Sequence, residues 1–560
     1  MSNWAALQRE LLGSGKSKDE AGKSKDKGKG KNKSKGKGKG KGKGKGKGKE
    51  TLTGSSGQDG RGAESGKRAR KRKRDSNGDG IGDARDKRCG SDGKSNSKKT
   101  KKQKRGGATS RSEATLHLHL AMALGLPYPI EALPSPRPLF CTPSSHPKLV
   151  EKLMATSYAG AVIEDGASSL AASDHAKFHA AMKVLKARGW FKFDFVQPGK
   201  IEELGPTYVR RVVVGEPGMT YKYLNARVFA VPWAGPALEA ADAAVAGALG
   251  AIRELNEVMI AKGNAHLEAA GTPGSTLFNL TLINDMDVLT GEGEGKPPPF
   301  EGLGRAVVSW HQDTSLEDWS TIGVYQLTAE NETAPWHVGL RVIYDEVTPK
   351  LALPLDHGAM YFLLGDFNHH HQHVVVCGSS HRYSSTHRVT TTEHNHFDRV
   401  FPRLTRAVRK AKKLTKSPAA LRALLPRPGS TWDLLCESFL VLEFEWIRQY
   451  WWHGATHHKL QRGLAYWPER VAQLEKAWAQ LLALFRDVAT LTASRPQSKL
   501  AAAFASLQAD VAREREAWRA RFAAVDAKVT AGEWTGVDLP IDWRRCPVAH
   551  GASSLVGATD

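Results

Sequence analysis

Histidine, aspartate and arginine residues in the middle of this 560-residue chain have spacings that suit metal chemistry. In the segment SWHQD, the residues His311 and Asp313 should lie on one face of a strand, because side chains alternate along a strand. A second imidazole could come from the downstream run His369, His370, His371 and His373. Two histidines and one carboxylate form the facial triad of non-haem iron(II) oxygenases, which leaves positions open for a co-substrate and oxygen.

The strand that follows indicates what that co-substrate could be. In HRYSSTHRV, the side chains of Arg382, Ser384, Thr386 and Arg388 alternate and should share one face. Two guanidinium groups inside a barrel are costly unless they meet an anion. A dicarboxylate such as 2-oxoglutarate fits, since an arginine and a hydroxyl can bind its distal carboxylate. The alternatives are an outward-facing edge strand and, for the histidine run, a metal-scavenging surface.

The elements that must position these residues are mainly short strands. From Thr276 to Val389, strand-like segments are broken at short intervals by Gly, Pro, Asn and Asp, which is typical of a sandwich or barrel. Tyr208–Val231 is also strand-like, with RRVVVG, a turn at EPGMT and then YKYLNARVFAV. Ser173–Arg188 and Pro236 to about Ala261 read as helices. The predicted fold class is therefore α+β.

After about Arg403 the hydrophobic period becomes helical. We expect one helix from about Ser430, then helices over Val471–Val488 and Leu500–Val529 with a Pro496-containing linker between them. This pattern predicts an antiparallel helical bundle whose aromatic stripe is core.

The charge of the chain is concentrated in its first part. The net charge is +24, and residues 1–110 hold 35 Lys and Arg against 12 Asp and Glu, so the rest is nearly neutral. Residues 1–112, with their Lys-Gly repeat, are predicted to be disordered and to contact the phosphate backbone of nucleic acid. Lys67–Arg74 and Lys98–Arg105 fit nuclear-import signals. Asp75–Asp86 matches part of a calcium loop, but it lacks the final Glu and the flanking helices.

The cysteines and the hydropathy exclude some classes of protein. Five scattered cysteines without a CxxC pair indicate a reducing compartment and no thiolate zinc site. No apolar run is long enough for a membrane span, and the N-terminus does not fit a secretory signal. The expected location is the nucleus, with the cytoplasm as an additional possibility, and the oligomeric state stays open.

Long blocks of this sequence resemble the FTO family of nucleic-acid demethylases, in the same order. These blocks are GEPGMTYKYLNARVFAVPW, VSWHQD, WHVGLRVIYDEVTPKLALPLDHGAMYFLL, HQHVVVCGSSHRYSSTHRV and LEFEWIRQYWWHG. The resemblance covers roughly residues 140–535. It implies a double-stranded β-helix (jelly-roll) catalytic domain with flanking helices over residues 140–402. A helical C-terminal domain over 403–535 and a tail over 536–560 would follow.

The resemblance also assigns roles to residues. His311, Asp313 and His373 would bind iron(II); His373 is preferred over His371 as the second histidine of HQH, although both have the same strand parity. Asn284, Tyr361, Arg382, Ser384, Thr386 and Arg388 would form the 2-oxoglutarate pocket. Arg211, Tyr221, Tyr223, Leu224, Trp310 and Thr314 would form the pocket for the methylated base. Without the resemblance, Tyr221 and Tyr223 read as ordinary core residues.

The implied reaction is oxidative removal of an N-methyl group, with ascorbate as the reductant. The best substrate expectation is N6-methyladenine in single-stranded RNA, and methylated thymine or uracil and single-stranded DNA are alternatives. Thr314 departs from the family, which has an acidic residue here that helps to read the substrate amine. The loop Gly291–Gly304 also differs, so strand selectivity stays open. A protein that binds nucleic acid through a vestigial barrel is the rival from another class.

Overall fold

The structure is a computed structural model of the chain. It describes residues 140–196, 205–207, 209–235, 240, 242–288, 303–344, 347–454, 466–533, 546–548 and 555. The predictions for the basic tail, its two import-like clusters and the Asp75–Asp86 loop lie outside these residues, as do most of the loop at 291–304 and most of the tail at 536–560. None of the described helices is long and apolar enough to cross a membrane.

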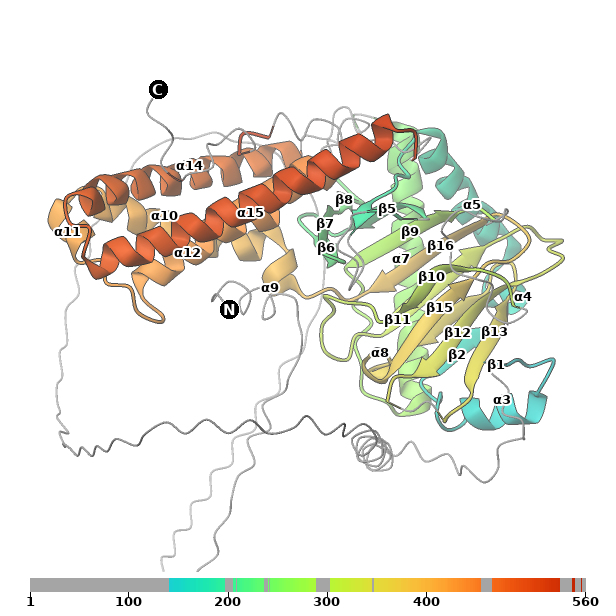
Figure 1. Cartoon of the computed structure of the whole chain (residues 1–560). Helices are drawn as coiled ribbons and strands as arrows, with labels where there is room; N and C mark the ends of the chain where they lie inside the picture. Colours follow the sequence, from blue (N-terminus) through green and yellow to red (C-terminus); the bar gives the residue numbers. More distant parts are fainter. Residues whose placement is uncertain are drawn as a thin grey trace, which may run out of the picture. The chain divides into compact units, whose positions relative to one another are not determined.

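The middle of the chain forms two β-sheets (Figure 1). One sheet has the order β1 (Phe140–Cys141), β13 (Lys350–Leu355), β12 (Trp336–Val342), β15 (His371–Val376) and β10 (Ala306–His311). The other has the order β2 (Ala161–Glu164), β14 (Met360–Leu363), β11 (Ile322–Leu327), β16 (Arg382–Arg388), β9 (Leu280–Met286), β5 (Arg210–Gly215) and β8 (Val231–Pro232). From β9 to β16 the chain crosses repeatedly between the sheets, and all pairings among these strands are antiparallel. The predicted succession of short strands is confirmed.

Strand β16 is buried on both of its faces. Every one of its seven residues is buried, so its alternation separates two interiors rather than an inside and an outside. One face carries Arg382 and its alternate neighbours, and the other packs beneath helices α5 (Ala172–Ala187) and α7 (Ala243–Ala270). These helices lie behind the sheets in Figure 1. The edge-strand alternative for this segment is therefore wrong.

The two helices that cover this sheet were predicted with different success. The helix expected at Ser173–Arg188 is confirmed by α5. The next helix runs nine residues past Ala261 to Ala270, where Gly271 ends it with φ +59°. Gly263 lies inside this helix. Its missing Cβ makes room for Thr276, whose Cγ2 would lie 2.9 Å from an added Cβ.

A separate hairpin stands beside the seven-stranded sheet. It pairs β6 (Thr220–Tyr223) with β7 (Ala226–Phe229). The strand-like segment YKYLNARVFAV is thus divided into two strands, because Leu224 and Asn225 form a two-residue turn with φ +44° and +65°. Both turn residues occupy the left-handed region, whose twist matches that of the flanking strands.

The C-terminal part is helical, as predicted. Its elements are α10 (Phe397–Leu414), α11 (Pro418–Arg422), α12 (Thr431–Leu440), the π-helical segments η2 (Val441–Ile447) and η3 (Tyr450–Gly454), α14 (Tyr466–Ala493) and α15 (Lys499–Thr530). Ser430 caps α12, since its hydroxyl accepts from the Asp433 N–H at 3.3 Å. Helix α10 starts at Phe397, before the residue at which we expected helical periodicity. One hydrophobic core joins these helices and also includes Phe195 and Phe229.

Short elements complete the described fold. They are β3 (Phe195–Val196), β4 (Gly205–Pro206), α3 (Pro147–Met154), α4 (Gly166–Ser169), α8 (Phe367–His370) and α9 (Thr392–Asn395).

Candidate active site

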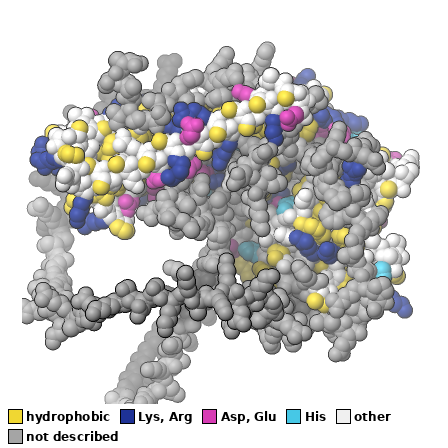
Figure 2. All heavy atoms as spheres, in the orientation of Figure 1, with side chains coloured by type: hydrophobic (Ala, Val, Ile, Leu, Met, Phe, Trp, Pro, Cys, Tyr) yellow, Lys and Arg dark blue, Asp and Glu magenta, His cyan; other side chains and the backbone are white. Residues whose placement is uncertain are grey.

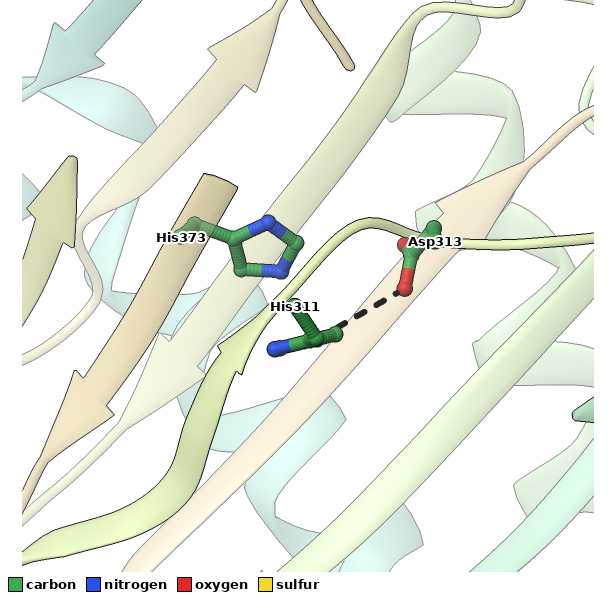
Figure 3. A group of neighbouring side chains, drawn as sticks. All are labelled: His311, Asp313 and His373. Carbon is green, nitrogen blue, oxygen red and sulfur yellow. Dashed lines mark ion pairs between the residues drawn. The ribbon is translucent and has the colours of Figure 1, made fainter. Parts of the chain in front are cut away.

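Two strands of the five-stranded sheet bring the predicted metal ligands together. Strands β10 and β15 pair in a register that places His311 opposite His373. One ligand atom each of His311, Asp313 and His373 lie within 4.8 Å of one another, and the side chains converge in Figure 3. His311 Nε2 is 3.8 Å from Asp313 Oδ1, and the two imidazole centroids are 4.0 Å apart.

Hydrogen bonds fix the orientation of two of these residues. His311 Nδ1 lies 2.7 Å from the Ser309 carbonyl, which can only accept, so Nδ1 carries the proton and Nε2 keeps a lone pair for a metal. The backbone N–H of Asp313 donates to Asn368 Oδ1 at 3.0 Å, and Asn368 Nδ2 donates back to the Asp313 carbonyl at 2.9 Å. Helix α8 therefore anchors the segment that carries Asp313.

The structure distinguishes His373 from His371, which sequence parity did not. The ring nitrogens of His371 lie 3.0 Å from the Phe367 carbonyl and 2.8 Å from the Ser157 carbonyl. Its ring also stacks on Phe367, with centroids 3.8 Å apart. His371 is thus held by other segments, and His373 is the histidine that meets His311 and Asp313.

The protonation of the three residues suits a divalent cation. Burial lowers the pKa of His373 to about 3 and also lowers the pKa of His311, so both imidazoles are neutral. Burial alone would raise the pKa of Asp313, but the positive charge of Arg388 outweighs it, so that pKa is lowered. Two neutral imidazoles and one carboxylate are the donor set that non-haem iron(II) prefers.

Arg382 is a buried cation without an ion pair among the described residues. It is 1% exposed, and no described carboxylate forms an ion pair with it. Among the described residues its Nε has no hydrogen-bond partner, while Nη1 lies 3.5 Å from Met286 Sδ. Burial lowers its pKa to about 10, and Tyr361 hydrogen-bonds to it. A buried, under-satisfied guanidinium of this kind fits a carboxylate ligand.

Polar side chains surround Arg382 on the same face of the sheet. Asn284 lies opposite Ser384 and donates to its hydroxyl at 3.2 Å. Thr386 lies two residues further along β16 and is also buried. Burial raises the pKa of Tyr361 to about 12, so its hydroxyl remains a donor. The structure thus brings the predicted co-substrate residues to one interior.

Arg388 connects the metal residues with the predicted base pocket. Its Nη2 lies 2.9 Å from Asp313 Oδ2, so it joins β16 of one sheet to the segment that follows β10 of the other. Its guanidinium carbon lies 4.8 Å from the centre of the Tyr221 ring. Nε and Nη1 have no hydrogen-bond partner among the described residues, so these donors can serve a ligand.

The predicted base-binding residues form an aromatic and basic cluster. The rings of Tyr221 and Tyr223 stack with centroids 5.7 Å apart and an interplanar angle of 18°. The Arg211 guanidinium lies 4.9 Å from the Tyr223 ring. Asp194 holds both, since its Oδ2 accepts from the Tyr223 hydroxyl at 2.7 Å and lies 3.3 Å from Arg211 Nε.

Asp194 was not among the residues that we predicted from the sequence. Its signal was a single acidic residue within the aromatic segment FKFDF, where a buried carboxylate needs a cationic or hydroxyl partner.

Thr314 lies beside this cluster. Its hydroxyl donates to the Lys222 carbonyl at 3.2 Å, and Thr314 also hydrogen-bonds to the Tyr221 phenol. The residue that departs from the family therefore stands next to a predicted base-binding ring.

Two predicted base-pocket residues lie elsewhere. Trp310 alternates with His311 along β10, so it points away from the metal residues and stacks on Phe140 and Arg341. Leu224 sits in the β6–β7 turn, 45% exposed, and lines a different, small pocket with side chains of the helical part, among them Trp452. The structure therefore does not bring Trp310 and Leu224 together with Tyr221 and Tyr223, and their assignment to the base pocket stays a prediction.

Comparisons with known proteins give one family for both parts of the chain. The family model of the FTO catalytic domain matches residues 149–391, and that of the FTO C-terminal domain matches residues 403–548. The chain is 31% identical over 321 residues to "Alpha-ketoglutarate-dependent dioxygenase FTO" from Xenopus laevis. That match covers 49% of this chain and 62% of the Xenopus protein, so the chain spans less than two thirds of this relative.

A solved structure is also similar to this chain. It is the crystal structure of an oxidoreductase of the 2OG-Fe(II) oxygenase family from Burkholderia pseudomallei, with 14% identity and a TM-score of 0.26. The similarity covers 46% of this chain and 93% of the bacterial one.

Proposed function

Because this chain belongs to the FTO family, we propose that it is an iron(II)- and 2-oxoglutarate-dependent dioxygenase that demethylates N-methylated bases in nucleic acid. One observation carries the proposal: His311, Asp313 and His373 converge where Arg388 of the facing sheet reaches Asp313. Arg382 lies on the same face of β16 as Arg388, and its Nε has no hydrogen-bond partner within the part of the chain that the structure describes.

We infer that the two sheets form a double-stranded β-helix. The support is the strand order, β10-β15-β12-β13 in one sheet and β14-β11-β16-β9 in the other. Eight consecutive strands thereby make two four-stranded sheets with an interior between them.

The residues present fit both groups that this reaction needs. His311 Nε2, Asp313 and His373 would hold iron(II), and Arg382 with Ser384 and Tyr361 would hold the distal carboxylate of 2-oxoglutarate. Iron(II) and 2-oxoglutarate, when bound, would use oxygen to hydroxylate an N-methyl group of the base, which would then leave as formaldehyde. 2-Oxoglutarate would be converted to succinate and carbon dioxide. The chain itself orients the reactants and excludes water from a buried site.

The proposed substrate is N6-methyladenine in single-stranded RNA. An extruded base would stack on the ring of Tyr221 or Tyr223, and Arg211 would contact its edge. Asp194 supports this role, since it fixes Arg211 and Tyr223 in place. Thr314 can accept a hydrogen bond but carries no charge, so methylated thymine or uracil, and single-stranded DNA, are the alternatives to test.

A turnover assay tests the proposal. The protein is loaded with iron(II) without oxygen, and single-stranded RNA with one N6-methyladenosine is added together with 2-oxoglutarate and ascorbate. Oxygen is then admitted, and loss of the methyl group is followed by mass spectrometry. We expect demethylation that requires 2-oxoglutarate and is lost in the His311→Ala, Asp313→Ala double variant.

Other outcomes would lead to different conclusions. Succinate formation without demethylation of any offered base would leave the oxygenase and remove the substrate proposal. A protein that binds neither iron(II) nor 2-oxoglutarate would instead be a nucleic-acid-binding protein with a vestigial barrel.

A further inference from the structure

The strongest charged feature outside the candidate site is helix α10. Residues 397–416 contain eight Lys and Arg and one Asp, which gives a net charge of +7. The remaining residues after Ser110 hold 39 Lys and Arg against 45 Asp and Glu, so this helix is a basic surface on an otherwise slightly acidic body. The eight cations are Arg399, Arg403, Arg406, Arg409, Lys410, Lys412, Lys413 and Lys416.

Five of these cations form a row along one side of the helix. Arg399, Arg403, Arg406, Lys410 and Lys413 follow each other at intervals of four, three, four and three residues, which places them on one face over about 21 Å. Like charges at this spacing weaken a helix. The opposite face is apolar and is buried in the bundle core. We call these five residues the basic row.

Within the described residues, the row is almost free of acidic partners. Arg403 is the one member with an ion pair there, a 3.7 Å contact with the exposed side chain of Glu393. An open surface hollow is lined by Arg406, Lys410 and Lys413 of the row together with Arg409, Lys412, Thr415 and Lys416. By contrast, basic and acidic side chains alternate along α15 on the face shown in Figure 2.

Helix α10 begins directly beside the strand that carries the predicted base-binding tyrosines. The Phe397 N–H donates to the Gly218 carbonyl at 2.8 Å, and the Thr220 hydroxyl donates to the Asn395 carbonyl at 2.9 Å. Thr220 immediately precedes Tyr221 in β6. The basic row therefore starts next to the hairpin of the candidate base pocket and continues along the bundle.

We propose that the basic row of α10 binds the phosphate backbone of the single-stranded nucleic acid whose base enters the candidate site. This inference rests on the proposed function, which supplies the nucleic-acid substrate. Four of the five cations are exposed, all five lie along a line, and within the described residues only Arg403 has an acidic partner, which suits a polyanion site. A membrane surface fits less well, because an amphipathic helix inserts its apolar face, and that face is buried here.

The test compares two triple variants of the full chain. One is Arg406→Gln, Lys410→Gln, Lys413→Gln in the basic row. The control is Lys476→Gln, Arg486→Gln, Arg495→Gln, which removes the same charge from exposed positions of α14 and its C-terminal end. Binding of fluorescein-labelled, unmethylated single-stranded RNA is measured by anisotropy over a range of salt concentrations. The basic tail is present in every protein, so the difference between variants isolates the row.

We expect the row variant to bind RNA roughly 10- to 100-fold more weakly at about 0.1 M salt, and the control to bind like wild type. The slope of log affinity against log salt should fall in magnitude by about 2, since each lost phosphate contact on a single strand contributes about 0.7. Equal affinity and equal slope in both triple variants would overturn the proposal and leave the row as solvated charge.

Two further measurements distinguish this inference from binding to a membrane surface and from the proposed demethylation. Loss of binding to anionic phospholipid vesicles, with RNA affinity unchanged, would overturn it in favour of a membrane surface. Demethylation by wild type is measured in parallel with the RNA binding, which needs no turnover. Weakened RNA binding by the row variant with no demethylation by wild type would keep the surface and discard the proposed reaction.

Discussion

Two adjacent residues of the buried strand β16, His387 and Arg388, differ in charge and in the partners that surround them. Arg388 faces the metal residues and is paired with Asp313, whereas His387 faces helix α7 and has only neutral partners. Arg382 shares the face of Arg388 but lacks such a partner. A cation is kept on this strand only where an anion is present or expected, because burying an unpaired charge is costly.

At this scale the role of Arg382 can be tested by Arg382→Met. We expect 2-oxoglutarate to bind about 10- to 100-fold more weakly, because a hydrogen bond to a charged group contributes about 1.5–3 kcal/mol. The stability of the ligand-free protein should not fall, since the variant removes an unpaired buried charge. Anaerobic titration calorimetry with manganese(II) in the metal site measures the affinity. Arg341→Met, on the outer face beside Trp310, is the control, and equal affinities in the two variants would refute the assignment.

A second residue-scale prediction concerns acid stability. Burial lowers the pKa of His387 to about 3, below its ordinary value near 6.5. Above pH 6.5 the His387 imidazole is neutral in both the folded and the unfolded state. Below pH 6.5 it takes up a proton only in the unfolded state. The contribution of His387 to the free energy of unfolding is therefore complete above about pH 6.5. It falls by about 1.4 kcal/mol per pH unit as the pH drops toward 3.

His387→Gln should remove that contribution to the slope. Urea unfolding between pH 6 and 4 measures the dependence, and His369→Gln at an exposed position serves as the control. An unchanged slope in the His387 variant would show that its pKa is not depressed in the folded protein.

At the scale of elements, the β6–β7 hairpin is clamped by the first π-helical segment. Lys222 and Arg227 both pair with Glu445 of η2, and all three are buried. Burial would raise the pKa of Glu445, but the two cations outweigh it and keep the carboxylate charged. Lys222 lies between Tyr221 and Tyr223, so this clamp fixes the strand that presents the candidate base-binding rings.

Glu445→Gln should break this clamp. It leaves two buried cations without a carboxylate, which costs about 3–5 kcal/mol. The matched control is Glu475→Gln, because the pKa of Glu475 is raised by burial and a glutamine can still accept from the Trp451 indole. Denaturant unfolding compares the two, and a loss no larger in Glu445→Gln than in Glu475→Gln would show that the ion pairs are not important for stability.

At the scale of the whole molecule, the helical part shares its core with the small strands β3 and β7 of the preceding part. Phe195 and Phe229 pack among the bundle residues, and the Trp467 indole donates to the Ala230 carbonyl at 2.7 Å. We therefore expect these two parts to unfold together. A ligand that binds only at the candidate metal site should then raise the melting temperature of the bundle too.

Manganese(II) with 2-oxoglutarate tests this coupling. At 100 times the dissociation constant the ligands should stabilise the protein by about 2.7 kcal/mol and raise the melting temperature by a few degrees. Near-ultraviolet circular dichroism follows the tryptophans, of which seven described ones lie in the bundle and five lie before it, so the signal reports on both parts. The His311→Ala, Asp313→Ala variant should show no shift, and a shift of the sheets without the bundle would separate the two parts.

Some of this protein is determined by local sequence alone. The alternation of His311 with Asp313, and of Arg382 with Ser384, follows from the two-residue period of a strand. The helices α5, α14 and α15 follow from hydrophobic repeats that need no tertiary context. The turn at Leu224 and Asn225 was not predicted, because leucine gives no signal for the left-handed region and Asn225 alone was a weak one.

Only the tertiary structure decided which distant residues meet. His371 and His373 share one parity, and only the pairing of β15 with β10 and the contacts of His371 with Ser157 separate them. Asp194 beside Arg211, and Glu445 beside Lys222, join segments that the sequence does not relate. Alternation and period are properties of neighbouring residues, whereas register and buried charge pairing depend on chain segments that come together only when the whole core forms.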